Sequence, residues 1–164
     1  MTSLEARSEP EIILVFGEGG HAEQMRRLLK LLDLAPSQCV SLVDRDGLLP
    51  ELAVEQYVLT PLRDKIRGSY LQVPLSIFRQ LSVLRVLLFS NKAKSLITTG
   101  PGICVLPSII MRLKGGQVIY IETWCRFKSK SMTGRFMQLI ASRFYVQNES
   151  LLNLYPKAIY GGRL

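Results

Sequence analysis

Short apolar runs alternate with helical patterns along this chain of 164 residues. The runs are rich in valine, isoleucine and leucine, as expected of strands that are buried on both faces. Strands that alternate with helices predict βαβ units, and therefore an α/β fold with a single parallel sheet flanked by helices. The length suits one domain, residues 1–164, in which the polar residues 1–10 are expected to be disordered. The expected strands are 12–16, 38–43, 54–60, 95–98, 117–121 and 144–146. One helix is expected to begin at Ala22, and four more are expected at 71–90, 103–113, 134–141 and 150–155.

A glycine-rich corner, GEGGH at residues 17–21, joins the first expected strand to the first expected helix. Glycines let the backbone turn sharply and let a ligand approach it, and the N–H groups at a helix start favour an anion. The corner fits a plain turn with a solvent-facing His21, which is the only histidine of the chain. It also fits the G-x-G-x-x-G/A spacing of a Rossmann dinucleotide site, with Asp44 after the next apolar run as the ribose-binding acid.

Two further loops follow expected strands, and the carboxyl ends of parallel strands meet at one edge of a sheet. In TTGPG, residues 98–102, Gly100 and Gly102 leave the backbone accessible to a ligand, and the loop is a second potential anion-binding site. The loop at 122–135 contributes Glu122, Arg126, Lys128, Lys130 and Arg135, together with Ser129, Ser131 and Thr133. A histidine beside two glycine loops and a basic, hydroxyl-rich loop predicts a site for a phosphorylated, polyhydroxylated ligand.

Positive charge is concentrated in one part of the chain, whose formal net charge is +8 at pH 7. Residues 112–143 hold seven basic residues and one acid, Glu122. Such a segment attracts phosphate from nucleic acid, anionic lipid or a nucleotide-sugar, although an ordinary solvated surface has the same composition. Cys39, Cys104 and Cys125 are odd in number and lack a CxxC spacing, which indicates a reducing cytosol. With one histidine and no cluster of ligands, we expect no metal site and no cofactor.

The expected helix at 71–90 has an unusual composition. Its polar residues fall on one narrow stripe, and the rest of its surface is apolar. Such a helix is either buried in the core or partly immersed in a membrane interface, and flanking cations favour a bilayer surface. The flanking cations are Arg63, Lys65, Arg67, Lys92 and Lys94. We recognise neither a signal peptide nor an apolar run of membrane-spanning length in the sequence.

Five segments, taken together and in this order, resemble a known family of glycosyltransferase subunits. They are GEGGH, TTGPGICVLP, YIETWCRFKSKSMTGR, FYVQN and the terminal YPKAIYGGRL. The chain from residue 12 to residue 164 resembles the PssD/CpsF-type subunits of bacterial capsule and exopolysaccharide glycosyltransferases. It is similar also to the membrane-recruiting subunit of the eukaryotic enzyme that adds the second N-acetylglucosamine to dolichol-linked chitobiose. More distantly, it resembles the acceptor half of MurG.

The resemblance implies an inverting GT-B glycosyltransferase that is split across two polypeptides. This chain would be the Rossmann-like N-terminal, acceptor-binding half, and a PssE/CpsG-like partner would bind the UDP-sugar. The acceptor would be a polyprenyl-diphosphate-linked saccharide of capsule or exopolysaccharide synthesis. The chain is expected to be a hexosyltransferase subunit, inactive alone and peripheral on the cytoplasmic face of the inner membrane. The eukaryotic relatives begin with a spanning helix that this sequence lacks, which favours the bacterial branch.

The same resemblance implies roles for individual residues. An inverting transfer needs a base for the acceptor hydroxyl, and His21 is the candidate, with Glu122 or Glu18 as the alternative. The wall of the cleft is expected to contain Gly19, Gly20, Thr99, Gly100 and Gly102. The acceptor diphosphate is expected to bind Arg126, Lys130, Thr133 and Arg135. Fixed cations and helix N-termini can stabilise a leaving diphosphate, so the reaction requires no metal.

Two other functions fit parts of the sequence. A stand-alone NAD(P)-binding oxidoreductase would use the glycine corner, but the chain has no Tyr-x-x-x-Lys pair or other recognisable hydride-transfer constellation. A nucleic-acid-binding module would use the basic segment, but the sequence shows no recognisable DNA- or RNA-binding signature. We therefore expect no nucleic-acid partner.

Overall fold

A seven-stranded sheet forms the centre of the computed structural model, which describes residues 11–44, 49, 51–53, 55–59, 84–85 and 93–164. Every pair of neighbouring strands is parallel, and the order is β3-β2-β1-β4-β5-β6-β7. The strands are β1 Ile12–Phe16, β2 Cys39–Val43, β3 Glu55–Val58, β4 Ser95–Thr98, β5 Gln117–Ile121, β6 Arg143–Val146 and β7 Ile159–Tyr160. The prediction of one parallel sheet flanked by helices is confirmed.

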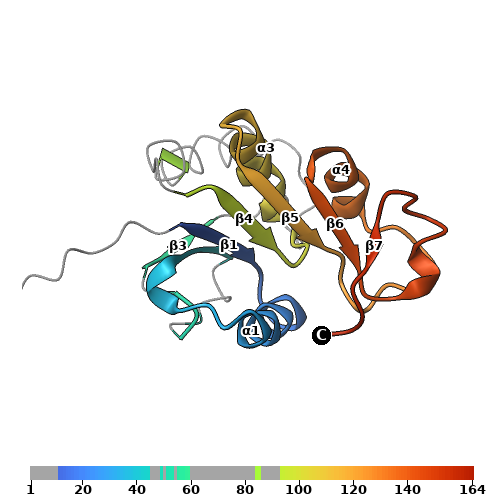
Figure 1. Cartoon of the computed structure of the whole chain (residues 1–164), viewed down its shortest axis with the longest axis horizontal. Helices are drawn as coiled ribbons and strands as arrows, with labels where there is room; N and C mark the ends of the chain where they lie inside the picture. The colour runs from blue at the N-terminus through green and yellow to red at the C-terminus, as the bar shows by residue number, and fades with distance from the viewer. Residues whose placement is uncertain (1–10, 45–48, 50, 54, 60–83, 86–92) are drawn as a thin grey trace, which may run out of the picture.

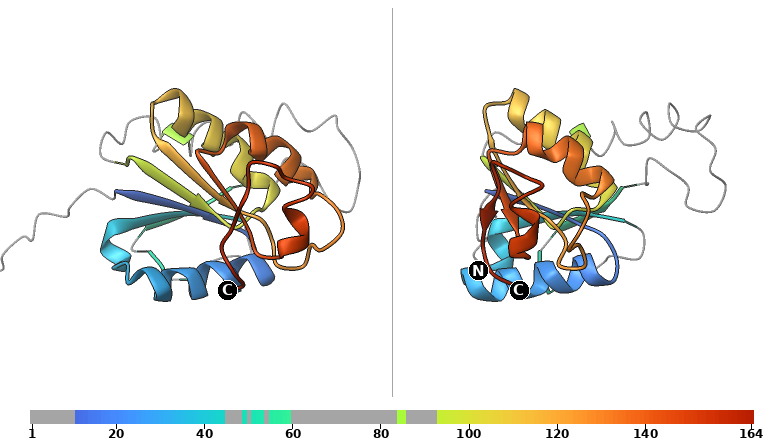
Figure 2. Two further views of the ribbon diagram at one scale, coloured as in Figure 1. Left: turned by 45° about the vertical axis from the view of Figure 1, so that its right-hand side comes forward. Right: turned by 90° about the vertical axis from the view of Figure 1, so that its right-hand side faces the viewer.

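Helices cover both faces of the sheet (Figure 1). Helix α1 (Gly20–Leu32) lies on one face, whereas α3 (Val105–Leu113) and α4 (Met132–Ile140) lie side by side on the other (Figure 2). Three short 3-10 helices complete the described elements: η1 Pro36–Gln38, η3 Gly102–Cys104 and η4 Glu149–Leu151.

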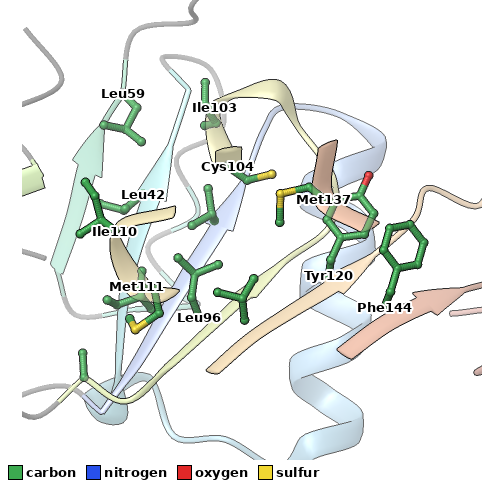
Figure 3. Close-up of a cluster of buried hydrophobic side chains, with 14 of the residues drawn as sticks. Leu42, Leu59, Leu96, Ile103, Cys104, Ile110, Met111, Tyr120, Met137 and Phe144 are labelled. Atoms are coloured by element: carbon green, nitrogen blue, oxygen red, sulfur yellow. The ribbon is translucent and has the colours of Figure 1, made fainter. Parts of the chain in front are cut away.

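The core is divided by the sheet into two layers because successive side chains of a strand point to opposite faces. Ile13 and Val15 of β1 join the cluster under α3 and α4, and Leu14 and Phe16 join the cluster under α1. Figure 3 shows the first cluster, in which Met137 of α4 lies over the rings that β5 and β6 contribute. The strand residues buried on both faces explain why the apolar runs carry so few polar residues.

The structure corrects two of the expected elements and adds one strand. The helix expected at 150–155 is only the short η4 followed by turns, because Pro156 disfavours helical backbone at the preceding Tyr155. The helix expected at 134–141 begins earlier, at Met132, where Ser131 caps it. The two-residue strand β7 was not predicted, since so short an edge strand has no period to detect.

The expected helix at 71–90 lies outside the described residues, apart from Leu84 and Arg85. Both of these residues are helical. Leu84 is fully buried in the cluster under α3 and α4, and Arg85 is exposed. Leu84 therefore belongs to the core. Residues 1–10, which were expected to be disordered, also lie outside the described residues.

The strand order reverses beside β1. The chain proceeds from β1 outward to β2 and β3, and then returns to place β4 on the other side of β1. The loops after β1 and β4 therefore leave the same edge of the sheet towards helices on opposite faces, α1 and α3. In open α/β sheets such a reversal marks the position of the ligand-binding crevice, at the carboxyl ends of the two strands.

Candidate functional site

His21 and Thr99 join the two loops that flank the crevice. The Nδ1 atom of His21 lies 2.6 Å from the carbonyl oxygen of Thr99, and the Thr99 hydroxyl donates to the carbonyl oxygen of His21 at 3.0 Å. A carbonyl oxygen only accepts hydrogen bonds, so Nδ1 carries a proton and the lone pair of the neutral ring is on Nε2. Thr99 is fully buried and His21 is half-buried. His21 is therefore an anchored ring and not a solvent-facing turn residue.

The glycines of the two loops fall into two groups. Gly19 and Gly102 are exposed, and a Cβ atom built on either one meets nothing within 4 Å. Gly19 has φ +60°, a conformation that favours glycine, and it is the N-cap residue directly before α1. Gly20 is exposed as well, and its nearest neighbour is the indole nitrogen of Trp124. The backbone at Gly19, Gly20 and Gly102 can thus be approached closely by a ligand.

Gly100 and Thr99 are less exposed than these three glycines, since Gly100 is half-buried and Thr99 is buried. Gly100 has φ +97°, and a Cβ atom there would lie 3.1 Å from the hydroxyl of Tyr120. The side chain of Thr99 is occupied in holding His21. Thr99 therefore acts on the site through His21, and the expectation that Thr99 and Gly100 line the cleft stays a prediction.

Gly17 also serves packing. A Cβ atom at this position would lie 2.7 Å from Oδ2 of Asp44 and 3.3 Å from Cβ of Pro101. Asp44, which the dinucleotide interpretation made a ribose-binding acid, therefore has its carboxylate against the backbone of Gly17. Strands β1 and β2 are neighbours, so this contact packs the loop after β1 against the loop after β2.

Glu122 is buried, which corrects the expectation that it lies at the rim of the site. Its side chain is 1% exposed and accepts hydrogen bonds from the Ser131 hydroxyl at 2.8 Å, the Tyr155 hydroxyl at 2.7 Å and the Thr123 N–H at 3.0 Å. Burial and the neighbouring Glu122 carboxylate raise the pKa of Tyr155 above its ordinary value. A buried carboxylate with three donors is a structural anchor for the loop that follows it.

The side chains of Asn148 and Ser150 hydrogen-bond to the backbone of the basic loop at 122–135. The Asn148 amide donates to the carbonyl oxygens of Trp124 at 2.9 Å and Arg126 at 2.5 Å, and the Ser150 hydroxyl donates to that of Phe127 at 2.7 Å. Neither residue was predicted to matter for the site. For Asn148, the signal in the sequence is an amide side chain soon after the apolar strand β6. A polar side chain that is enclosed at such a position needs hydrogen-bond partners.

The cations of the basic loop lie at the carboxyl edge of the sheet, as predicted. Arg126 and Arg135 are exposed, and Lys130 is half-buried, with Nζ 5.0 Å from the ring centre of Tyr155 and 3.4 Å from Oε1 of Gln138. Thr133 is half-buried in the first turn of α4. The loop therefore presents positive charge beside a helix start, and this arrangement favours a bound phosphate.

Two buried amides connect α1 to this loop. Gln147 donates to Oε1 of Gln24 at 2.5 Å and to the carbonyl oxygen of Glu122 at 3.0 Å. Gln24 donates in turn to the carbonyl oxygen of Gly20 at 3.0 Å, and accepts from the N–H of Trp124 at 3.3 Å. The start of α1, the end of β5 and the end of β6 are thus fixed relative to one another.

Comparison with known proteins identifies the family. A family model described as oligosaccharide biosynthesis protein Alg14 like matches residues 12–164. The chain belongs to the Alg14-like family. It is 27% identical over 174 residues to the UDP-N-acetylglucosamine transferase subunit alg14 of Schizosaccharomyces pombe, with 94% of this chain and 83% of the relative covered. It is 25% identical over 183 residues to the UDP-N-acetylglucosamine transferase subunit ALG14 of Mus musculus, with 96% and 84% covered.

This Alg14-like chain also shares its fold with part of a solved glycosyltransferase structure. It superposes on Acinetobacter baumannii MurG with a TM-score of 0.58 at 14% identity, over 94% of this chain and 44% of MurG. The sheet and its helices resemble the N-terminal half of that GT-B fold. Two parts of the predicted resemblance, to the membrane-recruiting subunit and distantly to MurG, agree with these matches. The assignment to the PssD/CpsF type stays a prediction.

Membrane contact of the Alg14-like chain was expected from its sequence. Across the parts of the chain that the structure describes, no helix has both the length and the apolar character needed to cross a bilayer.

Proposed function

We propose that this chain is the acceptor-binding subunit of a two-component inverting glycosyltransferase, which transfers a sugar from a UDP-sugar to a polyprenyl-diphosphate-linked saccharide. The observation that carries the proposal is the pair of hydrogen bonds between His21, which follows β1, and Thr99, which follows β4 on the other side of the strand-order reversal. The backbone of exposed glycines and a basic loop lie at the same edge of the sheet. Membership of the Alg14-like family, whose relatives are named as UDP-N-acetylglucosamine transferase subunits, supports it.

In this proposal residues 1–164 are a single half-domain on the acceptor side of a GT-B enzyme. A complete enzyme of that type needs two such α/β domains, and this chain spans 44% of MurG. A separate donor-binding subunit, PssE/CpsG-like in our prediction, supplies the other wall of the cleft and brings the UDP-sugar. The chain alone is therefore inactive.

His21 is the proposed catalytic base. With Nδ1 bound to Thr99, the Nε2 lone pair takes the proton of the acceptor hydroxyl as that oxygen attacks the sugar. The UDP leaves from the opposite face of the sugar, which inverts the anomeric centre. Glu18, exposed in the same loop, is the alternative base. Glu122 is assigned a positioning role, because its carboxylate is buried among three donors.

The proposed acceptor contacts are electrostatic. Arg126, Lys130 and Arg135, with the Thr133 hydroxyl, bind the diphosphate of the lipid-linked acceptor, and the backbone at Gly19, Gly20 and Gly102 lines its sugar. Cations at a fixed loop hold a diphosphate well, because charge-assisted hydrogen bonds are stronger than neutral ones.

The biological setting is the finer part of the proposal. UDP-N-acetylglucosamine is the first donor to test, because it appears in the names of the relatives. Capsule or exopolysaccharide synthesis, and a peripheral location on the cytoplasmic face of the inner membrane, follow from the PssD/CpsF resemblance. These assignments predict a hexosyltransferase that meets its acceptor at a membrane.

Reconstitution tests the proposal. The chain, its donor-binding partner and vesicles that carry a polyprenyl-diphosphate-linked N-acetylglucosamine are combined with radiolabelled UDP-N-acetylglucosamine, and lipid-linked product is counted. We expect product from the pair and none from either subunit alone. Robust turnover by the isolated chain would contradict the split enzyme. Saturable binding of NADH by the chain, followed by fluorescence, would favour the oxidoreductase alternative.

A further inference from the structure

The only tryptophan of the chain, Trp124, lies in the loop after β5, beside the glycine corner that follows β1. A Cβ atom built on Gly20 would lie 3.9 Å from the indole nitrogen of Trp124. Gly20 is exposed and directly precedes His21, and Trp124 is half-buried. The indole therefore stands next to accessible backbone and close in sequence to the proposed base.

Contacts from three other residues fix Trp124 in place. Its backbone N–H donates to Oε1 of the buried Gln24 at 3.3 Å, and its carbonyl oxygen accepts from the Asn148 amide at 2.9 Å. The guanidinium of Arg27 lies over the indole, 5.1 Å from the ring centre. A ring that is held in this way loses little further freedom when a ligand packs on it.

The indole N–H of Trp124 is an unused hydrogen-bond donor. In the part of the chain that the structure describes, the hydrogen bonds of Trp124 are made by its backbone, and no acceptor meets the indole nitrogen. A tryptophan that is partly enclosed usually pairs this N–H with an acceptor. Because the nitrogen lies beside the exposed Gly20, a ligand oxygen can supply the acceptor.

A hollow of about 360 Å³ adjoins the indole. Its lining residues are Arg27, Trp124, Arg163 and Leu164. It lies where α1 meets the end of the chain, which Figure 1 shows beside that helix. Small-molecule sites have volumes of about 300–1,000 Å³, so the hollow has the size for a small saccharide.

The charge of the hollow does not favour a phosphate. Arg27 pairs with Glu23 at 2.7 Å and also donates to the carbonyl oxygen of Leu164 at 3.3 Å. The hydrogen bonds from Arg27 and Arg26 lower the pKa of the Glu23 carboxyl, so the pair stays ionised and its charges cancel. What remains for a ligand is an aromatic ring, its N–H donor and the exposed Arg163.

That combination suits a sugar. The C–H bonds on one side of a sugar ring pack on an aromatic face, and its hydroxyl oxygens accept hydrogen bonds from N–H donors. We propose that Trp124 and the adjoining hollow bind the saccharide of the acceptor. The sugar ring packs on the indole, and its oxygens accept from the indole N–H and from Arg163.

The position of Trp124 also fits the chemistry of a lipid-linked sugar, in which saccharide and diphosphate are joined directly. Trp124 is two residues from Arg126, which is proposed to bind the diphosphate, and both belong to the basic loop. One loop would thus hold both parts of the acceptor. The identity of the ligand as the acceptor rests on the proposed function, whereas the saccharide-binding surface rests on the geometry alone.

Fluorescence of the full chain tests the surface directly. Because the chain has one tryptophan, its emission reports on this site alone. The chain, without donor subunit or membrane, is titrated with the methyl glycosides of N-acetylglucosamine, glucose and galactose. We expect a saturable change in emission and protection from acrylamide quenching with at least one glycoside. A response to none of them would overturn the proposal. A response to uridine or UDP, and to no glycoside, would overturn it in favour of a nucleotide.

Two substitutions separate stacking from hydrogen bonding. Trp124→Phe keeps an aromatic face without the N–H donor and should weaken glycoside binding about threefold. Trp124→Leu removes the aromatic face as well and should weaken binding about tenfold. Saturation-transfer NMR measures binding, since these variants lack the fluorophore, and thermal unfolding checks that they fold. In the reconstituted pair, both variants should raise KM for the acceptor and leave KM for the UDP-sugar unchanged.

An aromatic residue of the same loop provides the matched control. Phe127 is 48% exposed, and the hollow is lined by other residues. Phe127→Leu should bind glycosides like the unmodified chain. Equal binding by Trp124→Leu and Phe127→Leu would overturn the proposal. Loss of donor-subunit capture by Trp124→Leu, with glycoside binding kept, would overturn it in favour of a protein partner.

The outcome is separable from that of the proposed function. Glycoside binding is measured without donor subunit, nucleotide or lipid, so it can succeed where sugar transfer fails. Transfer by a pair that contains Trp124→Leu, with an unchanged KM for the acceptor, would remove the saccharide site and leave the glycosyltransferase proposal intact.

Discussion

His21 and Glu122 follow buried strands in the same way along the sequence, but the fold gives them opposite surroundings. His21 is half-buried, and one ring nitrogen is fixed by the carbonyl oxygen of Thr99. Glu122 is enclosed and accepts hydrogen bonds from Ser131, Tyr155 and Thr123. A base has to reach its substrate, so the difference in exposure favours His21.

Two substitutions of His21 separate catalysis from positioning. His21→Asn keeps a donor near the carbonyl oxygen of Thr99 but has no basic nitrogen, and His21→Ala removes both. If His21 is the base, both variants should lower kcat of the reconstituted pair by roughly 10²–10⁴-fold. Binding of the donor subunit should be unchanged in both. Near-normal turnover of His21→Asn, with loss confined to His21→Ala, would show that the ring only positions the loop.

At the scale of elements, the start of α4 depends on the buried carboxylate. Ser131 caps the helix by accepting from the N–H of Gly134 at 2.8 Å, while its hydroxyl donates to Glu122. A Cβ atom at Gly134 would overlap Glu122, Tyr155 and Ser131. The basic loop and the helix therefore share one anchor, and Gly134 is the position where the two pack most closely.

Gly134→Ala should destabilise the protein although alanine is the better helix former. The intrinsic gain is about 1 kcal/mol, and the strain of displacing a buried hydrogen-bonded network should exceed it, for a net loss of about 1–3 kcal/mol. Urea unfolding measures the difference. Gly102→Ala is the control, because its Cβ atom meets nothing within 4 Å, and its stability should change by less than about 0.5 kcal/mol. A stabilised Gly134→Ala variant would show that the hydrogen-bonded network rearranges around the added methyl group at little cost in free energy.

At the scale of the whole molecule, Gln147 connects the ends of the described fold. Its amide donates to Gln24 in the first helix and to the carbonyl oxygen of Glu122, and its oxygen accepts from the N–H of Leu164 at 3.0 Å. Arg27 of α1 also donates to the carbonyl oxygen of Leu164, at 3.3 Å. The last residue is thereby held against α1, as the position of the C-terminus in Figure 1 shows.

Gln147→Leu preserves volume but removes all three hydrogen bonds. The free energy of unfolding should fall by about 2–4 kcal/mol, because Gln24 and the backbone partners lose a buried polar contact. Hydrogen exchange at the C-terminal residues should become faster. Gln117→Leu, at an exposed position that begins β5, is the control and should leave both measurements unchanged. Unaltered exchange in Gln147→Leu would mean that Arg27 alone holds the C-terminal segment.

The sequence by itself determined the architecture and the edge of the sheet that carries the site. The run 12–16 is apolar throughout and the run 117–121 is apolar after Gln117, and such local patterns are enough to mark buried parallel strands and the helices between them. The edge follows from parallel topology, because all the loops after the strands leave from the same side. The sequence alone therefore places GEGGH, TTGPG and the basic loop at one edge of the sheet.

Only the tertiary structure decided which of those residues face a ligand. Thr99 and Glu122 carry the same local signals as Gly102 and Arg126, yet they are buried. Exposure depends on contacts between residues far apart in the chain, such as Gly100 with Tyr120 and Glu122 with Tyr155. The anchoring roles of Gln24, Gln147 and Asn148 arise for the same reason. A buried amide is defined by its partners, and local sequence does not name them.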